Sequence, residues 1–199
     1  MTDTNLRPAL KLDIVVIGAG QAGLSAAYHL KHLGLEPLRD FIVLDGSPRP
    51  GGAWQYRWPS LTLTTVNGVR DLPGMGFSDF ASDTSVQASV AVPEYFAAYE
   101  AHFDLKVQRP ARVSVVCDRG ERLRVECEIG IFSARGLINA TGTWEKPYVP
   151  PDPGAERFGG LQLHTRDYVT ADVFAGKHVL IVGGGISALQ LLDDISQVT

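Results

Sequence analysis

Cysteine, basic runs and long apolar runs are all scarce in this sequence of 199 residues, and each scarcity excludes a class of protein. The two cysteines, Cys117 and Cys127, are too few for a disulfide framework, so we expect reduced thiols, although a bridge between neighbouring strands stays open. The 18 basic residues are outnumbered by 22 acidic ones, and the net charge of −4 argues against a nucleic-acid partner. We assign no metal site and no Ser–His–acid triad to the five histidines. This composition fits a cytoplasmic globular protein.

The apolar run nearest the start of the chain is too short for a membrane span. Ile14 to Leu30 falls short of the ~20 residues that a spanning helix needs, and Gln21 and three glycines interrupt it. The alternative interpretation is a signal peptide or membrane anchor, and the interruption of the run and the lack of a convincing cleavage site argue against it. We therefore expect no membrane partner.

A strand, a glycine turn and a helix are the first features that the sequence does contain. Residues 14–17 are apolar and mostly β-branched, as in a buried parallel strand. Gly18, Gly20 and Gly23 follow with the spacing G-x-G-x-x-G and lead into helical periodicity. In this motif the first glycine makes a tight turn, the second lets a pyrophosphate approach the backbone, and the third lets helix and strand pack closely. With Gln21 at the helix start, the turn predicts a dinucleotide phosphate site.

A lone glycine motif is a weak signal, and a second strand supplies the context that it needs. This strand, Phe41 to Leu44, ends in Asp45. Asp45 stands a little beyond the roughly 20 residues at which the motif places the acid that accepts the ribose hydroxyls. The alternative is a solvated turn acid before Gly46.

The loop after Asp45 contains small residues and then an aromatic one. Gly51 and Gly52 permit close backbone approach to a flat or charged ligand, and Trp54 can cover that ligand. An ordinary surface loop with a packed tryptophan is the alternative. Because the loop directly follows an acid-ended strand, we favour a ligand-binding role.

The middle of the chain predicts a helix, an antiparallel run and a returning strand. Pro93 to Phe103 indicates a helix with proline in its first turn and an aromatic stripe in the core. Short β-segments over 107–132, with a turn at 118–120, indicate an antiparallel meander. Residues 137–142 indicate a separate buried strand that returns beside the first strand and brings Gly142 to the nucleotide end. The fold class predicted is α/β, with a doubly wound, Rossmann-like parallel sheet and an antiparallel meander.

A second strand, glycine turn and helix are predicted near the end of the sequence. Residues 177–182 are mostly apolar, Gly183 and Gly185 follow, and Ala188 replaces the third glycine, as the motif allows. Two such turns in one chain indicate two dinucleotides and the start of a second Rossmann-like domain.

The stretch from Phe158 to Tyr168 narrows the interpretation because it fits F-x-G-x-x-x-H-x-x-x-(Y/F). With the two glycine turns, residues 51–54 and residues 140–142, this stretch resembles the flavin-containing monooxygenases over nearly the whole chain. The same motif ending in Trp-Pro would indicate the related Baeyer–Villiger monooxygenases, but here Val169 follows the tyrosine. On this resemblance the chain divides into an FAD-binding domain, a linker with the motif, and the start of an NAD(P)H-binding domain, over residues 1–150, 151–176 and 177–199.

The resemblance implies an oxidoreductase in which NADPH, with NADH not excluded, reduces FAD. The reduced flavin then adds oxygen as a hydroperoxide and oxygenates a small nucleophilic substrate. Asp45 is a mild departure, since many members use glutamate there. The residues carried over as cofactor contacts are Gly18, Gly20, Gln21, Gly23, Asp45, Gly52, Trp54, Val113, Gly142, Gly183 and Gly185.

The same resemblance suggests three residues for catalysis. Thr64 and Asn67 compete for the place of an asparagine beside the flavin N5, with Asn67 slightly favoured. His164 is the histidine of the motif, and a purely structural hinge role is its alternative. Members of the family are much longer than this chain, so two other readings stay open. One is a truncated, inactive FAD-binding fragment whose unfinished sheet edge pairs with another chain. The other is an FAD-dependent reductase of the same architecture.

Overall fold

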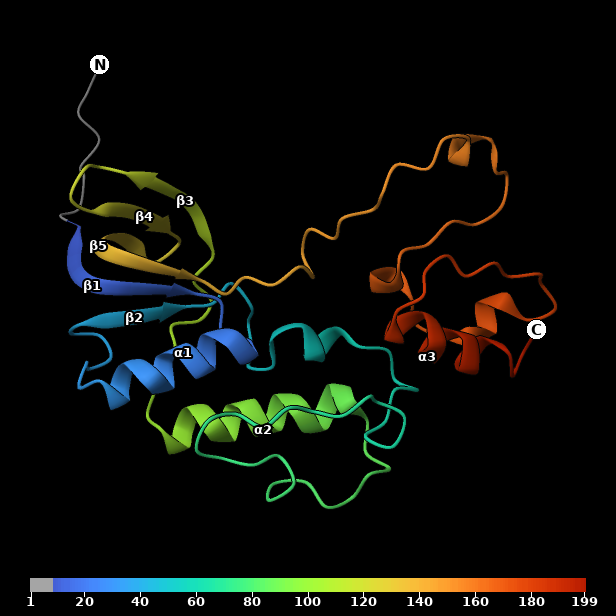
Figure 1. Cartoon of the computed structure of the whole chain (residues 1–199), viewed down its shortest axis with the longest axis horizontal. Helices are drawn as coiled ribbons and strands as arrows, with labels where there is room; N and C mark the ends of the chain where they lie inside the picture. The colour runs from blue at the N-terminus through green and yellow to red at the C-terminus, as the bar shows by residue number, and fades with distance from the viewer. Residues whose placement is uncertain (1–8) are drawn as a thin grey trace.

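The computed structural model describes residues 9–199, and its centre is a mixed five-stranded sheet with the strand order β2-β1-β5-β4-β3. Two helices lie beside this sheet, and an extended connection leads to a third helix (Figure 1). The strands and α-helices are β1 (Leu10–Ile17), α1 (Gln21–His32), β2 (Phe41–Leu44), α2 (Ala88–His102), β3 (Val113–Asp118), β4 (Leu123–Cys127), β5 (Gly130–Asn139) and α3 (Ile186–Ile195). The predicted α/β class is confirmed.

Strand β1 lies in the middle of the parallel part of the sheet. Val16 pairs with Val43 of β2 on one side and with Ile138 of β5 on the other. One face of β1 and β2 packs against α1 and α2 through residues such as Val16 and Phe41. The other face, which includes Val15, packs against the meander. Burial on both faces explains why residues 14–17 carry no polar side chain.

The meander is antiparallel as predicted, but its last strand is longer than expected. The segments ending at residue 132 and starting at residue 137 form one strand, β5. Residues 133–136 have the sequence Ser-Ala-Arg-Gly, which does not have the pattern of a strand. They nevertheless pair with β1, and Leu12 lies opposite Ala134. The same pairing starts β1 at Leu10, earlier than the sequence pattern indicated. Both cysteines are free, at the ends of the β3–β4 hairpin.

Helix α2 begins at Ala88, five residues before the predicted start, so Pro93 lies inside it. The Pro93 ring packs against Gly51, where a Cβ atom would lie 2.7 Å from the proline Cγ. The aromatic stripe is core, as predicted: Tyr95, Phe96 and Tyr99 are buried. The interior proline thus sits under the loop that follows β2.

The second glycine unit differs from the prediction in one part. Helix α3 forms, but residues 177–182 are not a strand. Leu180 and Val182 are 86% and 85% exposed, because among residues 9–199 no strand pairs with this stretch. No helix in that range has the length and apolar character that crossing a bilayer requires. The run from Ile14 to Leu30 instead divides into β1, a turn and α1.

Candidate functional site

A cavity of about 470 Å³ is lined by residues at the carboxyl ends of β1, β2 and β5. These strand ends lie beside the start of α1 (Figure 1). Its walls are the first glycine turn, the end of β2, the loop at residues 51–56 and the chain after β5. Ligands of open α/β sheets bind at this edge. A smaller cavity, about 370 Å³, lies at the C-terminal ends of α1 and α2 and contains none of the predicted site residues.

Most of the predicted FAD contacts line the larger cavity. They are Gly18, Gly20, Gln21, Asp45, Gly52, Trp54, Val113 and Gly142. Gly23 is buried in the first turn of α1 and is not part of the lining. The lining also contains residues that were not predicted, among them Arg112, Trp144 and Glu145. They lie in irregular chain, where no periodicity or motif could have indicated them.

The glycine turn leaves no room for side chains behind it. Gly18 has a φ of +97°, and a Cβ atom there would overlap the carbonyl oxygen of Ala140. A Cβ atom on Gly23 would overlap the carbonyl oxygen of Gly18. Toward the cavity the situation reverses, since the nearest atom to a Cβ on Gly20 is the Gly52 Cα at 4.0 Å. The turn is closed toward the sheet and open toward the cavity, with the first N–H groups of α1 available to an anion.

Asp45 is buried in the cavity wall, so it is not the solvated turn acid of the alternative interpretation. Its Oδ2 accepts a hydrogen bond from Nε of Arg109 at 2.8 Å. Its Oδ1 accepts a longer one, 3.3 Å, from the backbone N–H of Ser47. The carboxylate therefore has one firmly bonded oxygen and one with spare acceptor capacity.

Arg109 was not predicted, yet it contacts two carboxylates at once. Beyond Asp45, it makes a bidentate ion pair with Glu100 of α2, with N–O distances of 2.7 and 2.6 Å. Burial raises the pKa of the Glu100 carboxyl, and the Arg109 guanidinium opposes that shift. Arg109 lies in irregular chain before β3, and Glu100 lies on a helix predicted only for its aromatic core.

The loop after Gly52 forms a short 3₁₀ helix, Gly52–Tyr56, that carries the aromatic wall of the cavity. The guanidinium of Arg57 lies 5.7 Å from the centre of the Trp54 ring and 5.0 Å from the centre of the Trp144 ring. Such distances fit cation–π contacts. Burial lowers the pKa of Arg57, and its Nε is buried without a hydrogen-bond partner. Trp54 thus contacts a cation and apolar side chains of the core, and it also lines the cavity.

The three catalytic candidates do not line this cavity. Thr64 and Asn67 are exposed, and Thr64 Oγ1 donates a hydrogen bond to the carbonyl oxygen of Thr84 at 2.9 Å. His164 is half-buried, and its Nδ1 accepts a hydrogen bond from the backbone N–H of Arg166. The structure brings none of the three together.

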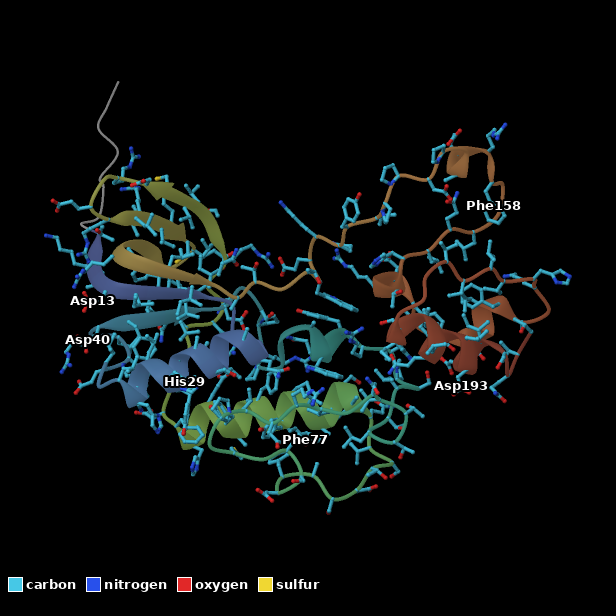
Figure 2. The ribbon with its side chains drawn as sticks, viewed as in Figure 1. Asp13, His29, Asp40, Phe77, Phe158 and Asp193 are labelled. Carbon is cyan, nitrogen blue, oxygen red and sulfur yellow. The ribbon has the colours of Figure 1, made fainter. Side chains whose placement is uncertain are left out.

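The Phe158–Tyr168 motif spans the connection to α3. Phe158 is exposed on the outer part of this connection, away from the sheet (Figure 2). Tyr168 is buried, and its hydroxyl donates a hydrogen bond to Asp194 of α3. Ser60 donates to the same Asp194 oxygen at 2.7 Å. The aromatic end of the motif therefore ties α3 to the loop that follows Trp58.

The second glycine turn lies outside the cavity. Gly183 has a φ of +139°, and a Cβ atom there would meet only Ala188, at 4.0 Å. A Cβ on Gly185 would have no neighbour within 4 Å. The predicted nicotinamide-cofactor contacts, Gly183 and Gly185, are thus on open chain at the start of α3.

The chain is similar to known oxidoreductases in sequence and in fold. The family model described as pyridine nucleotide-disulphide oxidoreductase matches residues 15–197. An uncharacterized CzcO-like oxidoreductase of Geobacillus kaustophilus is 30% identical over 186 residues, covering 94% of this chain and 52% of the relative. The indole-3-pyruvate monooxygenase YUCCA1 of Oryza sativa subsp. japonica is 32% identical over 187 residues, covering 91% and 44%.

Among solved structures, the flavin-containing monooxygenase from Stenotrophomonas maltophilia is similar with a TM-score of 0.84 and 44% identity. The match covers 95% of this chain and 56% of that protein. The chain thus spans about half the length of the relatives that it matches. It belongs to the pyridine nucleotide-disulphide oxidoreductase family and, within it, matches the N-terminal portion of the flavin monooxygenases.

Proposed function

We propose that this chain is the FAD-binding portion of a flavin monooxygenase that uses NAD(P)H and oxygenates a small nucleophilic substrate. The observation that carries the proposal is the cavity at the sheet edge. The glycine turn and the buried carboxylate of Asp45 line the same cavity, and close packing behind the turn excludes side chains at Gly18 and Gly23. Its relatives include monooxygenases and oxidoreductases. The reductase and inactive-fragment alternatives gain no support from these comparisons.

Each chemical group of FAD has a proposed partner among the cavity residues. The N–H groups at Gly20 and Gln21 suit the pyrophosphate, because the start of a helix favours anions. Asp45 suits the adenosine ribose and Val113 the adenine. Trp54 suits the flavin end, with the backbone of Gly52 and Gly142 beside it.

The bound flavin would supply the redox and oxygen chemistry, and the protein would position it. Gly183 and Gly185 at the start of α3 are the proposed cradle for NAD(P)H, with NADPH favoured by family habit. Asn67, or Thr64 in its place, would donate a hydrogen bond near the flavin N5, and His164 would lie at the join between the two cofactor regions. These roles remain proposals.

The remaining expectations follow from the same proposal. The partners are a small substrate and oxygen, the location is the cytoplasm, and the division at residues 150 and 176 marks the FAD domain, the linker and the start of the NAD(P)H domain. Self-association would use an unfinished edge of the sheet.

Flavin retention and oxygen uptake test the proposal together. We expect the purified chain to keep a flavin absorbance band after desalting, and a longer chain with the rest of the relatives' length to show NADPH-dependent oxygen uptake. Gly23→Ala should weaken the flavin band of the purified chain and the oxygen uptake of the longer chain. A longer chain that folds but never retains flavin would overturn the proposal.

A further inference from the structure

We propose that Arg109 and Glu100 are positioning residues of the adenosine-ribose site. In this arrangement Arg109 holds one oxygen of Asp45 so that the other oxygen is free to accept a ribose hydroxyl. The inference rests on the proposed function, because it assumes that Asp45 faces the ribose of FAD. It adds two residues to the site that neither the glycine motif nor the family motif contains.

The three side chains form a closed carboxylate–guanidinium–carboxylate chain. Arg109, Asp45 and Glu100 have side chains only 10%, 9% and 13% exposed. Nε of Arg109 bonds Asp45 at 2.8 Å, and the two terminal nitrogens bond both oxygens of Glu100. All three nitrogens of the guanidinium are thereby used. A bidentate pair fixes orientation more firmly than a single contact, so Glu100 sets the direction from which Arg109 meets Asp45.

The backbone around Asp45 is fixed by the same segment that carries Arg109. The Asp45 N–H donates to the carbonyl oxygen of Gln108 at 3.0 Å, and the Ala111 N–H donates to the carbonyl oxygen of Asp45 at 2.8 Å. The segment 108–111 therefore lies alongside the carboxyl end of β2 and forms hydrogen bonds with its outer edge. Main chain and side chain of Asp45 are held from one side, which leaves the cavity side open.

Charge explains why the arrangement needs an arginine. Two carboxylates lie in one buried region, and without a cation their repulsion and desolvation would favour protonation or rotation of one of them. A protonated or rotated Asp45 would be a poorer acceptor for a hydroxyl. Arg112, a cation that lines the cavity, is committed to Glu145 at 2.5 and 3.0 Å, and Arg109 reaches Asp45 from outside the lining. Arg109 is therefore the cation that faces Asp45.

Oδ1 of Asp45, a residue that lines the cavity, has hydrogen-bonding capacity left for a ligand hydroxyl. Its one hydrogen bond, from Ser47 at 3.3 Å, is long, and a carboxylate oxygen accepts at least two. Aspartate is one methylene shorter than glutamate, so it reaches less far and depends more on how it is held. Arg109 and Glu100 supply that hold.

The test compares two ligands that differ only in the ribose hydroxyls. ADP and 2′,3′-dideoxy-ADP are titrated into the purified chain by calorimetry, with Arg109→Lys, Glu100→Gln and Arg39→Lys as variants. Arg39 is the matched control, since it also lies between two carboxylates, Glu36 and Asp40, but is mostly exposed. Thermal unfolding of each variant reports whether it is folded.

We expect the parent chain and Arg39→Lys to bind ADP roughly 10-fold or more tighter than the dideoxy ligand, because a hydrogen bond to a charged acceptor is strong. Arg109→Lys should reduce this ratio toward one while leaving the affinity for the dideoxy ligand within about two-fold. Glu100→Gln should reduce the ratio by a smaller factor. It keeps the shape of the glutamate, so it supplies the test if Arg109→Lys does not fold.

Two results would overturn the inference, and they differ from failure of the proposed function. An unchanged ratio in the folded variants would show that Arg109 and Glu100 do not position Asp45. An equal loss of affinity for both ligands would show a purely structural role. If instead the parent chain bound FAD without distinguishing the two ADP ligands, the ribose role of Asp45 would fail. If the parent chain bound neither FAD nor ADP, the assignment of FAD to this cavity would be wrong.

Discussion

The two glycine turns of this chain have nearly the same sequence pattern and different surroundings. The turn at Gly18 follows β1, which has a parallel strand on each side and is buried on both faces. The turn at Gly183 follows residues 177–182, which pair with no strand among residues 9–199 and leave Leu180 and Val182 in solvent. In both units a helix begins at the third residue of the turn or just after it.

The comparison separates what a motif encodes from what its neighbours supply. Glycine spacing sets the local turn and the start of the helix, and both units have them. A parallel strand in addition needs hydrogen-bonding partners beside it, and only the first unit has them. A cavity then needs further walls, which β2, residues 51–56 and the chain after β5 supply for the first turn.

The largest expected effect is at the third glycine. Gly23→Ala should lower the free energy of unfolding by about 3 kcal/mol, because the new Cβ would overlap the Gly18 carbonyl oxygen. The second unit already has Ala188 at this place. Gly185→Ala, the control in open surroundings, should cost less than about 1 kcal/mol. Urea denaturation measures both, and equal costs would contradict the comparison.

Valines at related positions should give the next largest difference. Val16→Ala opens a space in the core between the sheet and the helices, and we expect a loss of roughly 2 kcal/mol in urea denaturation. Val182→Ala removes exposed atoms and should change stability by less than about 0.5 kcal/mol. If Val182→Ala were as costly as Val16→Ala, residues 177–182 would be a buried strand after all.

A smaller effect should follow from untying the second unit. Asp194→Ala removes the acceptor shared by Tyr168 and Ser60, and we expect faster amide hydrogen exchange in α3 by roughly 10-fold, with α1 unchanged. Asp193→Ala is the control, because Asp193 is an exposed neighbour on the same helix (Figure 2). Equal exchange rates in the two variants would show that the Tyr168–Asp194 contact does not hold α3.

The smallest expected effect is on alkaline stability. Burial raises the pKa of Tyr99 above its usual value of about 10. A phenol whose pKa is higher in the folded protein contributes stability that is present below about pH 10 and lost as the pH rises toward the folded pKa. Tyr99→Phe should therefore flatten the decrease in stability above about pH 10.

Tyr168 allows the same alkaline test in the second unit. Burial raises the pKa of Tyr168, and its hydrogen bond to Asp194 raises that pKa further. For Tyr168→Phe we expect the alkaline change in the hydrogen exchange of α3, not of the core helices. Global loss of stability in that variant would contradict the separation of the two units.

The sequence predicted the parts of the fold that depend on local pattern. β1, β2, α1 and the β3–β4 hairpin follow from apolar runs and turn residues, and the return of β5 beside β1 follows from the order of the elements. Pattern failed where contacts override it. Pro93 lies inside α2, and its ring packs on Gly51. Residues 133–136 form part of a strand because β1 pairs with them.

The glycines and the acid of the cavity could be predicted from the sequence. The residues that hold the acid in place could not. Gly18 and Asp45 are fixed by motif spacing, so they could be found from the sequence. Arg109 and Glu100 reach Asp45 only through tertiary packing of the 108–111 segment and α2, and neither has a local signal. The roles of Thr64, Asn67 and His164 rest on resemblance and stay predictions.

The most direct test of the central claim is a visible absorbance spectrum of the purified chain, recorded before and after FAD is added and the excess removed by desalting. The account predicts a retained flavin band, weakened in Gly23→Ala and kept in Gly185→Ala. The absence of a band in the folded parent chain would contradict the claim that the cavity at the end of β1 holds FAD in this chain.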